Sequence, residues 1–290
     1  MRIVDSLHRR PISAFIHNER NWSIEQAVDT LGRIGYDGID YGPIGAERPD
    51  TTRLQRLKMK ADESGLIHNS MHYRDFGFGA LADQQSHDAF LQAATEDLQI
   101  AGVLGCRDLA FHVADLPNRS NEQFIEANTA LFEEVGRLAV DSGVRVCLEN
   151  HYPTAHGRTI EELLAILDGL GMTTWAGICV DTGHAVLIGG NPAEMIRKAG
   201  PRLNMLHLHD NMGRQDTHLS VGLGVIDWFE VFAALDAVGF DGPLNLEIGG
   251  HHPHDEADAT AQAGYHNLLQ LLSEYYVIAE GTRKSVREGS

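Results

Sequence analysis

The feature that most restricts the fold is an alternation of short apolar runs with longer amphipathic stretches along the whole chain. The short runs have the length and composition of buried strands, and the stretches between them carry helix start and stop signals. Repeated strand-then-helix units predict an α/β fold, a single-domain (β/α)₈ TIM barrel, because parallel strands need crossover helices. The predicted strands are residues 12–16, 37–41, 66–72, 108–113, 144–149, 176–181, 203–209 and 243–248.

Helix boundaries are marked by local residue patterns. Ser23–Gln26 and Asp227–Glu230 have the spacing of capping boxes, in which the first and fourth residues cap each other's backbone. An open doubly wound sheet fits less well, because the first strand-to-helix turn lacks a glycine-rich phosphate loop. We therefore predict one barrel domain over residues 1–277 and a polar tail over residues 278–290, which either frays or docks on a partner. Glycines stand where helices should end, at Gly35, Gly65, Gly105, Gly143 and Gly239.

The bulk composition excludes several classes of function. The 290 residues are 43% hydrophobic, which is enough for one large core, and the formal net charge is −18. An acidic surface does not attract phosphate backbones or anionic lipid at long range, so we do not expect nucleic acid as a partner. The sequence shows neither a signal-peptide core nor an apolar run of about 20 residues that would span a membrane. Three cysteines without a paired motif are typical of reduced thiols, so we expect a cytoplasmic protein.

Ionisable residues occur at the carboxyl ends of successive predicted strands. Glu149 ends the fifth, Asp181 ends the sixth, and Glu247 lies near the end of the eighth, while His207 lies within the seventh. A single strand-end histidine or glutamate is more often structural than functional, but a series at one rim is improbable by chance. Three converging carboxylates repel one another, and a divalent cation is the simplest compensation. The sequence therefore predicts a divalent metal site.

Several motifs, in this order and spacing, resemble the xylose isomerase-like TIM barrel superfamily over nearly the whole chain. That superfamily contains sugar-phosphate isomerases and epimerases together with zinc apurinic-site endonucleases. The motifs are Leu148-Glu149-Asn150, Val180-Asp181-Thr182-Gly183-His184, His207-Leu208-His209-Asp210, Asp216-Thr217-His218-Leu219, residues 222–227 and Leu246-Glu247.

The resemblance implies a metal-dependent sugar or sugar-phosphate isomerase or epimerase. Glu149, Asp181, His207 and Glu247 would bind one divalent ion, most often Mn²⁺, with Co²⁺, Mg²⁺ and Zn²⁺ as alternatives. Glu149 and Glu247 would also be the acid and base around a metal-stabilised cis-enediolate. The implied assembly is a homo-oligomer, a dimer or a tetramer, acting on a small carbohydrate. The remaining substrate-binding candidates are His184, His209, Arg214, His72 and His112.

Two other activities stay open at this point. The missing glutamate near Ala155, which ketose 3-epimerases carry, leaves room for a lyase or dehydratase acting on a keto-polyol or an oxidised glycoside. A multinuclear zinc endonuclease is the second alternative, with Asp216 and His218 as additional metal ligands. Loop 150–159 lacks the glycine-rich sequence expected for it, and no cluster of basic and aromatic residues indicates DNA binding. A catalytically inactive binding module has no need of three convergent carboxylates.

Overall fold

Parallel strands form a nearly closed barrel in the computed structural model, which describes residues 10–17, 23–42, 50–74, 77–171, 173–249 and 257–288. The strand order is β7-β6-β5-β4-β3-β2-β1-β8. A parallel bridge between Leu208 and Leu246 joins the two ends of this sheet. The predicted single-domain (β/α)₈ fold is confirmed. The strands are β1 (Ile12–His17), β2 (Gly38–Asp40), β3 (Ile67–His72), β4 (Asp108–His112), β5 (Arg145–Glu149), β6 (Ala176–Asp181), β7 (Leu203–His207) and β8 (Leu244–Gly249).

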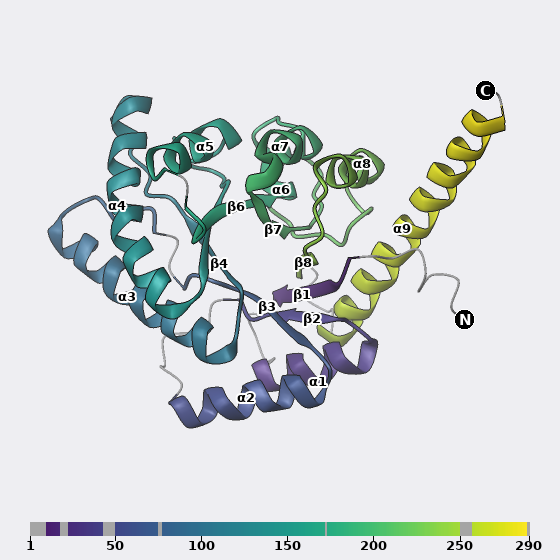
Figure 1. Ribbon diagram of the computed structural model, residues 1–290, viewed down its shortest axis with the longest axis horizontal. Helices are drawn as coiled ribbons and strands as arrows, with labels where there is room; N and C mark the ends of the chain where they lie inside the picture. The colour runs from purple at the N-terminus through teal and green to yellow at the C-terminus, as the bar shows by residue number, and fades with distance from the viewer. Residues whose placement is uncertain are drawn as a thin grey trace.

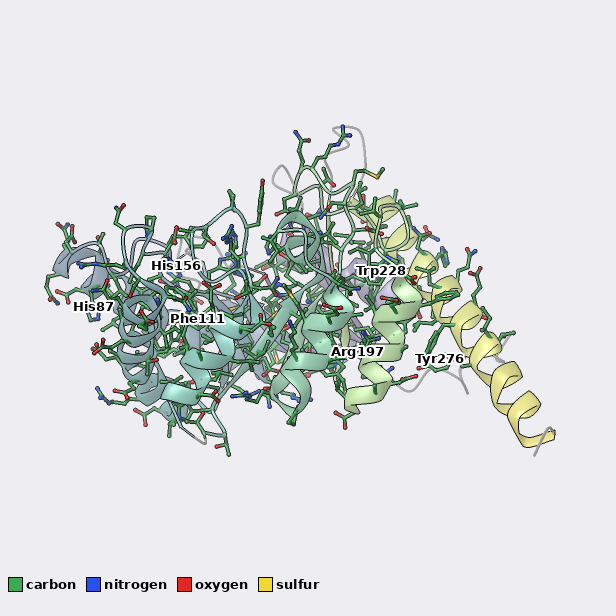
Figure 2. All side chains as sticks on the ribbon, turned by 90° about the horizontal axis from the view of Figure 1, so that it is seen from above. His87, Phe111, His156, Arg197, Trp228 and Tyr276 are labelled. Carbon is green, nitrogen blue, oxygen red and sulfur yellow. The ribbon has the colours of Figure 1, made fainter. Side chains whose placement is uncertain are left out.

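Helices form the outer layer around the strands (Figure 1). Most of them connect one strand to the next, so that the loops after the strands collect at one rim of the barrel. In Figure 2 this rim is the upper edge, where His156 and Trp228 are labelled. The helices are α1 (Ile24–Ile34), α2 (Thr51–Glu63), α3 (Gln84–Leu104), α4 (Asn121–Ser142), α5 (Ile160–Gly169), α6 (Thr182–Leu187), α7 (Pro192–Ala199), α8 (Trp228–Val238) and α9 (Ala257–Glu288), with a short 3₁₀ turn at Gly200–Arg202.

The predicted helix signals are mostly correct. Ser23 caps α1 in a reciprocal capping box with Gln26, and Gly35 ends that helix with φ 105°. Asp227 caps α8 by accepting from the backbone of Phe229 and Glu230. The Glu230 side chain does not complete a box and accepts instead from Asn191, the residue that caps α7.

Inside the barrel, four of the ionisable strand-end residues lie directly above a layer of four buried side chains. Residues two apart on a strand share a face. Each buried residue of this layer therefore lies one step below an ionisable residue on the same strand. The layer consists of Ala110, Cys147, Cys179 and Met205, beneath His112, Glu149, Asp181 and His207.

The last helix, α9, begins at the rim and runs past the opposite end of the barrel (Figures 1 and 2). Its first half packs on the barrel, where Tyr36 donates to the Ala261 carbonyl and Leu268 is buried. Val277 and Ile278, farther along, are exposed. The helix continues to Glu288, and a separate tail over residues 278–290 stays a prediction. Within the described part of the chain, no helix is long and apolar enough to cross a bilayer.

Candidate metal centre

Four predicted ligands meet at the carboxyl ends of β5 to β8. Glu149, Asp181, His207 and Glu247 each offer a ligand atom within 4.8 Å of the others, and all four side chains are buried. His207 Nδ1 lies 2.8 Å from Glu149 Oε1 and 2.9 Å from Glu247 Oε2. The sequence prediction brought these residues to one rim, and the structure places them in one group.

The second carboxylate oxygen of Glu149 faces two further histidines. Nε2 of His72 and Nε2 of His112 each lie 3.1 Å from Glu149 Oε2. His72 ends β3 and His112 ends β4, so consecutive strands deliver both imidazoles to the same oxygen. Glu149 therefore stands between two groups of nitrogen ligands, one on each side of its carboxylate.

Neighbouring histidines govern the charge of this group. Burial disfavours the ionised form of Glu149, but the imidazoles of His207 and His112 outweigh burial and hold its pKa well below the usual range. Burial likewise opposes the protonated form of His207. The Cys179 sulfur and the carboxylates of Glu149 and Glu247 nevertheless hold the His207 pKa well above its ordinary value. In this arrangement a protonated imidazole provides the positive charge that the carboxylates require.

The donor set fits a divalent cation. Three carboxylates and one imidazole are ligands for hard and borderline ions such as Mn²⁺, Co²⁺ and Zn²⁺. The side chains of Glu149, Asp181 and His207 are at most 2% exposed, so bulk water contributes little to separating their charges. A dication that replaces the His207 proton would satisfy all three carboxylates at once.

An outer cluster, defined as His184, His209, Asp216 and His218, lies beside Asp181. His209 Nε2 is 3.0 Å from Asp181, and Asp216 Oδ2 lies 3.0 Å from His184 Nε2 and 3.3 Å from His218 Nε2. Burial opposes the protonated form of His184, but Asp181 and Asp216 outweigh burial and raise its pKa to about 10. Two groups of side chains here could each hold a metal ion, one formed by Asp181, His184 and His209 and the other by His209, Asp216 and His218. The predicted additional ligands Asp216 and His218 therefore lie next to the central group.

Backbone contacts fix the strand ends that carry these ligands. Asn150 is fully buried, donates to the Asp181 carbonyl and accepts from the Asp181 N–H. The Thr182 hydroxyl donates to the His209 carbonyl and accepts from the His209 N–H. Asn150 and Thr182 stand within the sequence motifs, but nothing in a single sequence assigned them these positioning contacts.

A model of the xylose isomerase-like TIM barrel family matches residues 28–269. The chain belongs to this family. The resemblance seen in the strand-end motifs is thereby confirmed for the greater part of the molecule.

The proteins that are similar to this chain in sequence include carbohydrate enzymes. An inosose dehydratase from Klebsiella pneumoniae is 26% identical over 261 residues, which cover 78% of this chain and 82% of that protein. An L-ribulose 3-epimerase from Methylomonas sp. is 23% identical over 246 residues, covering 78% of this chain and 80% of the relative. An uncharacterized protein from Methanocaldococcus jannaschii is 33% identical over 141 residues, so this match spans only 47% of each chain.

A solved structure of the IOLI protein with a bound zinc atom has the same fold. It superposes with a TM-score of 0.79 at 18% identity, covering 91% of this chain and 99% of that one. At this identity the similarity shows only that the two chains share the barrel fold.

Other candidates lie at the same rim or away from it. Arg214 is exposed on the loop after β7 and makes no hydrogen bond or ion pair with other described residues, so its substrate role stays a prediction. His151 also lies at the mouth, with its ring centroid 4.1 Å from that of His112 and 4.7 Å from that of His184. Phe78, which was not predicted from the sequence, stacks on His112 with 5.4 Å between the two ring centroids.

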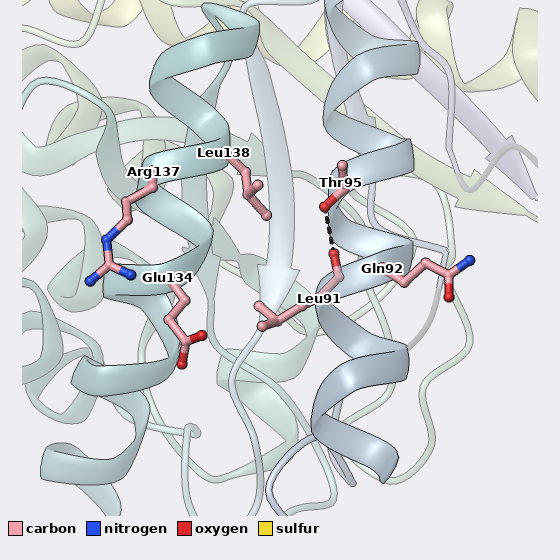
Figure 3. Close-up of a pocket in the computed structure, with 6 residues that line it drawn as sticks. All are labelled: Leu91, Gln92, Thr95, Glu134, Arg137 and Leu138. Carbon is pink, nitrogen blue, oxygen red and sulfur yellow. Dashed lines mark hydrogen bonds between the residues drawn. The ribbon is translucent and has the colours of Figure 1, made fainter. Parts of the chain in front are cut away.

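A separate hollow of about 320 Å³ lies on the outer wall between α3 and α4 (Figure 3). Leu91 and Leu138 point into the space between the helices, whereas Gln92 and Arg137 point away from it. None of the predicted site residues lines this hollow. It therefore belongs to the helical wall and not to the metal centre.

Proposed function

We propose that this protein is a divalent-metal-dependent carbohydrate isomerase or epimerase, which removes a proton next to a carbonyl group and returns it elsewhere. The observation that carries this proposal is the buried group of Glu149, Asp181, His207 and Glu247. The epimerase and dehydratase relatives support it, because proton removal next to a carbonyl is chemistry that both reactions can share. A zinc atom in the structurally similar IOLI protein supports a divalent ion.

Each residue has a defined part in this proposal. A cation held by the four ligands would polarise the substrate carbonyl and so acidify the neighbouring C–H bond. Glu149 and Glu247 stand on β5 and β8 and approach the mouth from different strands. One carboxylate accepts the proton from carbon, and the other delivers a proton to the adjacent carbon or the opposite face. His184 and His209 hold substrate oxygens by hydrogen bonds.

Proton exchange at carbon provides the test. Metal-loaded protein is incubated in D₂O with a panel of ketoses, ketose phosphates and inososes, and deuterium incorporation is followed by NMR. The proposal predicts exchange at one carbon next to the carbonyl. In Glu247→Gln the rate of this exchange should fall by a factor of about 10²–10⁴. Asp88→Asn serves as a control, because that exposed carboxylate lies on α3. Undiminished exchange in Glu247→Gln would remove Glu247 from the mechanism.

Dehydration is an alternative outcome of the same chemistry. The inosose dehydratase relative favours it, because a carbanion next to a carbonyl can expel a hydroxyl group at the following carbon. In the exchange experiment, loss of water from an inosose yields an unsaturated ketone with a distinct ultraviolet absorption. An epimerase produces instead a second stereoisomer without loss of water.

A multinuclear phosphodiesterase is the second candidate function. Two sets of side-chain contacts at the same mouth of the barrel favour this candidate. Glu149 lies beside His72 and His112, and Asp216 lies beside His184 and His218. Metal analysis separates the two candidates, because about one ion per chain fits the sugar enzyme and about three fit the nuclease. Cleavage of a duplex with one abasic site is the matching activity assay. The nine side chains that would hold the three ions are His72, His112, Glu149, Asp181, His184, His207, Asp216, His218 and Glu247.

A further inference from the structure

One carboxylate joins the loop after β4 to the loop after β5. Asp115 accepts hydrogen bonds from the backbone N–H of Ala155, at 3.2 Å, and from the backbone N–H of His156, at 3.1 Å. Hydrogen bonds to an ionised group are roughly twice as strong as those between neutral groups. The loop after β5 is therefore attached to its neighbour by a charged contact between Asp115 and Ala155, which are 40 positions apart in the sequence.

Asp115 is itself held in place by contacts on both sides. Its backbone N–H donates to the Phe78 carbonyl at 3.1 Å, which adds the loop after β3. The preceding residue, Ala114, is fixed by Asn128 of α4, whose side chain accepts from the Ala114 N–H at 2.8 Å and donates to the Ala114 carbonyl at 3.0 Å. Asn128 is fully buried. Asp115 thus connects three consecutive loops from a fixed position.

The loop after β5 folds back on itself next to this attachment. His156, labelled at the upper edge of Figure 2, stacks on Phe124 of α4 with 4.6 Å between ring centroids. His151 donates its N–H to the Gly157 carbonyl at 3.0 Å, which closes the loop. A methyl group on Gly157 would lie 2.4 Å from Val113 Cγ2, so the closed loop packs directly on the end of β4. The contacts of Asp115 with this loop therefore also determine where His151 lies.

Two of the residues that Asp115 holds through the backbone have rings at the mouth of the barrel. Phe78 and His151, here called the aromatic wall, have ring centroids 4.5 Å apart. The His151 ring lies 4.1 Å from that of His112 and 4.7 Å from that of His184, and the Phe78 ring lies 5.4 Å from that of His112. Since His112 Nε2 is 3.1 Å from Glu149, the wall stands beside the metal centre.

We propose that Asp115 is a positioning residue, which holds the aromatic wall at the mouth so that the wall contacts one side of the bound substrate. This inference rests on the proposed carbohydrate function. Aromatic side chains commonly line small-molecule sites, and the C–H groups of a polyol can pack on the Phe78 ring. The His151 imidazole can hydrogen-bond to a hydroxyl group. Asp115 acts through the loops and contacts neither substrate nor metal.

Chemical shifts of histidine ring protons report on the aromatic wall without any substrate. Protein labelled with ¹³C and ¹⁵N in histidine is studied by NMR in the presence of Zn²⁺, and His151→Gln assigns the His151 signal. The Phe78 ring is inclined at 65° to that of His151, so its ring current should displace the His151 shifts, and Phe78→Leu measures this displacement. Asp115→Ala should remove the displacement. Asp115→Asn should retain most of it, because Oδ1 alone accepts from both N–H groups.

A second capping carboxylate provides the matched control. Asp50 accepts from the Arg53 N–H at the start of α2, and Asp50→Ala should leave the His151 signal in place. An unchanged His151 signal in Asp115→Ala, or the same change in Asp50→Ala, would overturn the proposal.

Kinetics of deuterium exchange into the panel of ketoses, ketose phosphates and inososes test the effect on substrate. Asp115→Ala should raise KM about tenfold with little change in kcat, because the wall contacts the substrate away from the reacting carbon. Phe78→Leu should also raise KM, and the double variant should be little worse than Asp115→Ala alone, because Asp115 acts through the wall.

The outcomes separate a positioning role from a structural one. Reduced stability with unchanged KM in Asp115→Ala would assign Asp115 a structural role only, and independent effects in the double variant would show that it does not act through Phe78. Either result overturns the proposal. If the wild-type protein exchanges no compound of the panel, the proposed function fails, and the His151 signal still decides whether Asp115 positions the wall.

Discussion

Nδ1 of His207 lies 2.8 Å from Oε1 of Glu149, and the two side chains are 2% and 1% exposed. The same nitrogen lies 2.9 Å from Glu247 Oε2. Ion pairs at such depth depend on complete compensation, because desolvation of each charge costs several kcal/mol. A proton on His207 and a divalent ion are two ways to meet the same electrostatic requirement, and they compete for the same nitrogen.

Metal binding should therefore stabilise the folded protein. Addition of Mn²⁺, Co²⁺ or Zn²⁺ to chelator-treated protein is expected to raise the melting temperature, because the ligands are assembled only in the folded state. At a free metal concentration of about 100 Kd the gain is about 2.7 kcal/mol. Thermal denaturation with elemental analysis measures both effects. Asp181→Asn should lose most of the gain, and an equal gain in that variant would contradict the proposed ligand set.

Metal affinity should rise with pH. In the metal-free protein, burial opposes the charge on His207, but Cys179, Glu149 and Glu247 outweigh burial and keep its pKa well above the ordinary value. A metal ion at Nδ1 must displace this proton, so affinity increases about tenfold per pH unit below the raised pKa and levels off above it. Calorimetry in two buffers of different ionisation enthalpy measures the released proton. Affinity independent of pH between 6 and 8 would show that His207 is not a ligand.

Glu149 and Glu247 should differ in their importance for metal binding. Glu149 lies 2.8–3.1 Å from the ring nitrogens of His72, His112 and His207, and Glu247 Oε2 lies 2.9 Å from His207 Nδ1. We expect Glu149→Gln to abolish metal binding, and Glu247→Gln to retain weaker but measurable binding. Titration of each variant with Co²⁺, followed by its visible absorption, compares them. Equal loss in both variants would indicate that the two carboxylates are equivalent ligands.

The sequence was sufficient for the barrel because the signals of its elements are local. Strand runs and caps such as Ser23 depend on neighbours a few residues away, and the strand-end ligands follow from the two-residue period of a strand. The predicted strand 37–41 is two residues longer than β2 (Gly38–Asp40), whose ladder with β3 also shifts register between Ile39 and Asp40. Such a shift depends on the partner strand and leaves no mark in the sequence.

The contacts that form when the loops fold, within a loop or against another strand end, could not be predicted from the sequence. The position of His151 against His112 depends on how the loop after β5 folds back, where His151 donates its N–H to the Gly157 carbonyl. The four groups that surround the Asp210 carboxylate likewise come from residues 211–228, and only the folded loop brings them together. Motif spacing identified the ligands, but their supporting contacts require coordinates.

Asn150→Ala should weaken both stability and metal binding. The substitution leaves the buried N–H and C=O of Asp181 without their side-chain partner, at a cost of about 3 kcal/mol. Asn191→Ala is the matched control, because it removes the cap of α7 at a cost of about 1 kcal/mol but does not touch the metal centre. Urea denaturation and metal titration measure the two quantities. Unchanged metal affinity in Asn150→Ala would limit Asn150 to a structural role.

Gly183→Ala tests how tightly His209 is held against α6. A methyl group on Gly183 would lie 1.9 Å from His209 Cε1, so the imidazole must move away from Asp181. Within a helix, alanine is otherwise favoured over glycine by about 1 kcal/mol. We expect the clash to outweigh this preference and to destabilise the protein by about 1–3 kcal/mol, with weaker metal binding. Gly79→Ala, where a methyl group meets nothing within 4 Å, should leave metal affinity unchanged. A gain in stability from Gly183→Ala would mean that His209 can leave its position freely, and its proposed contact with substrate would then lose its geometric basis.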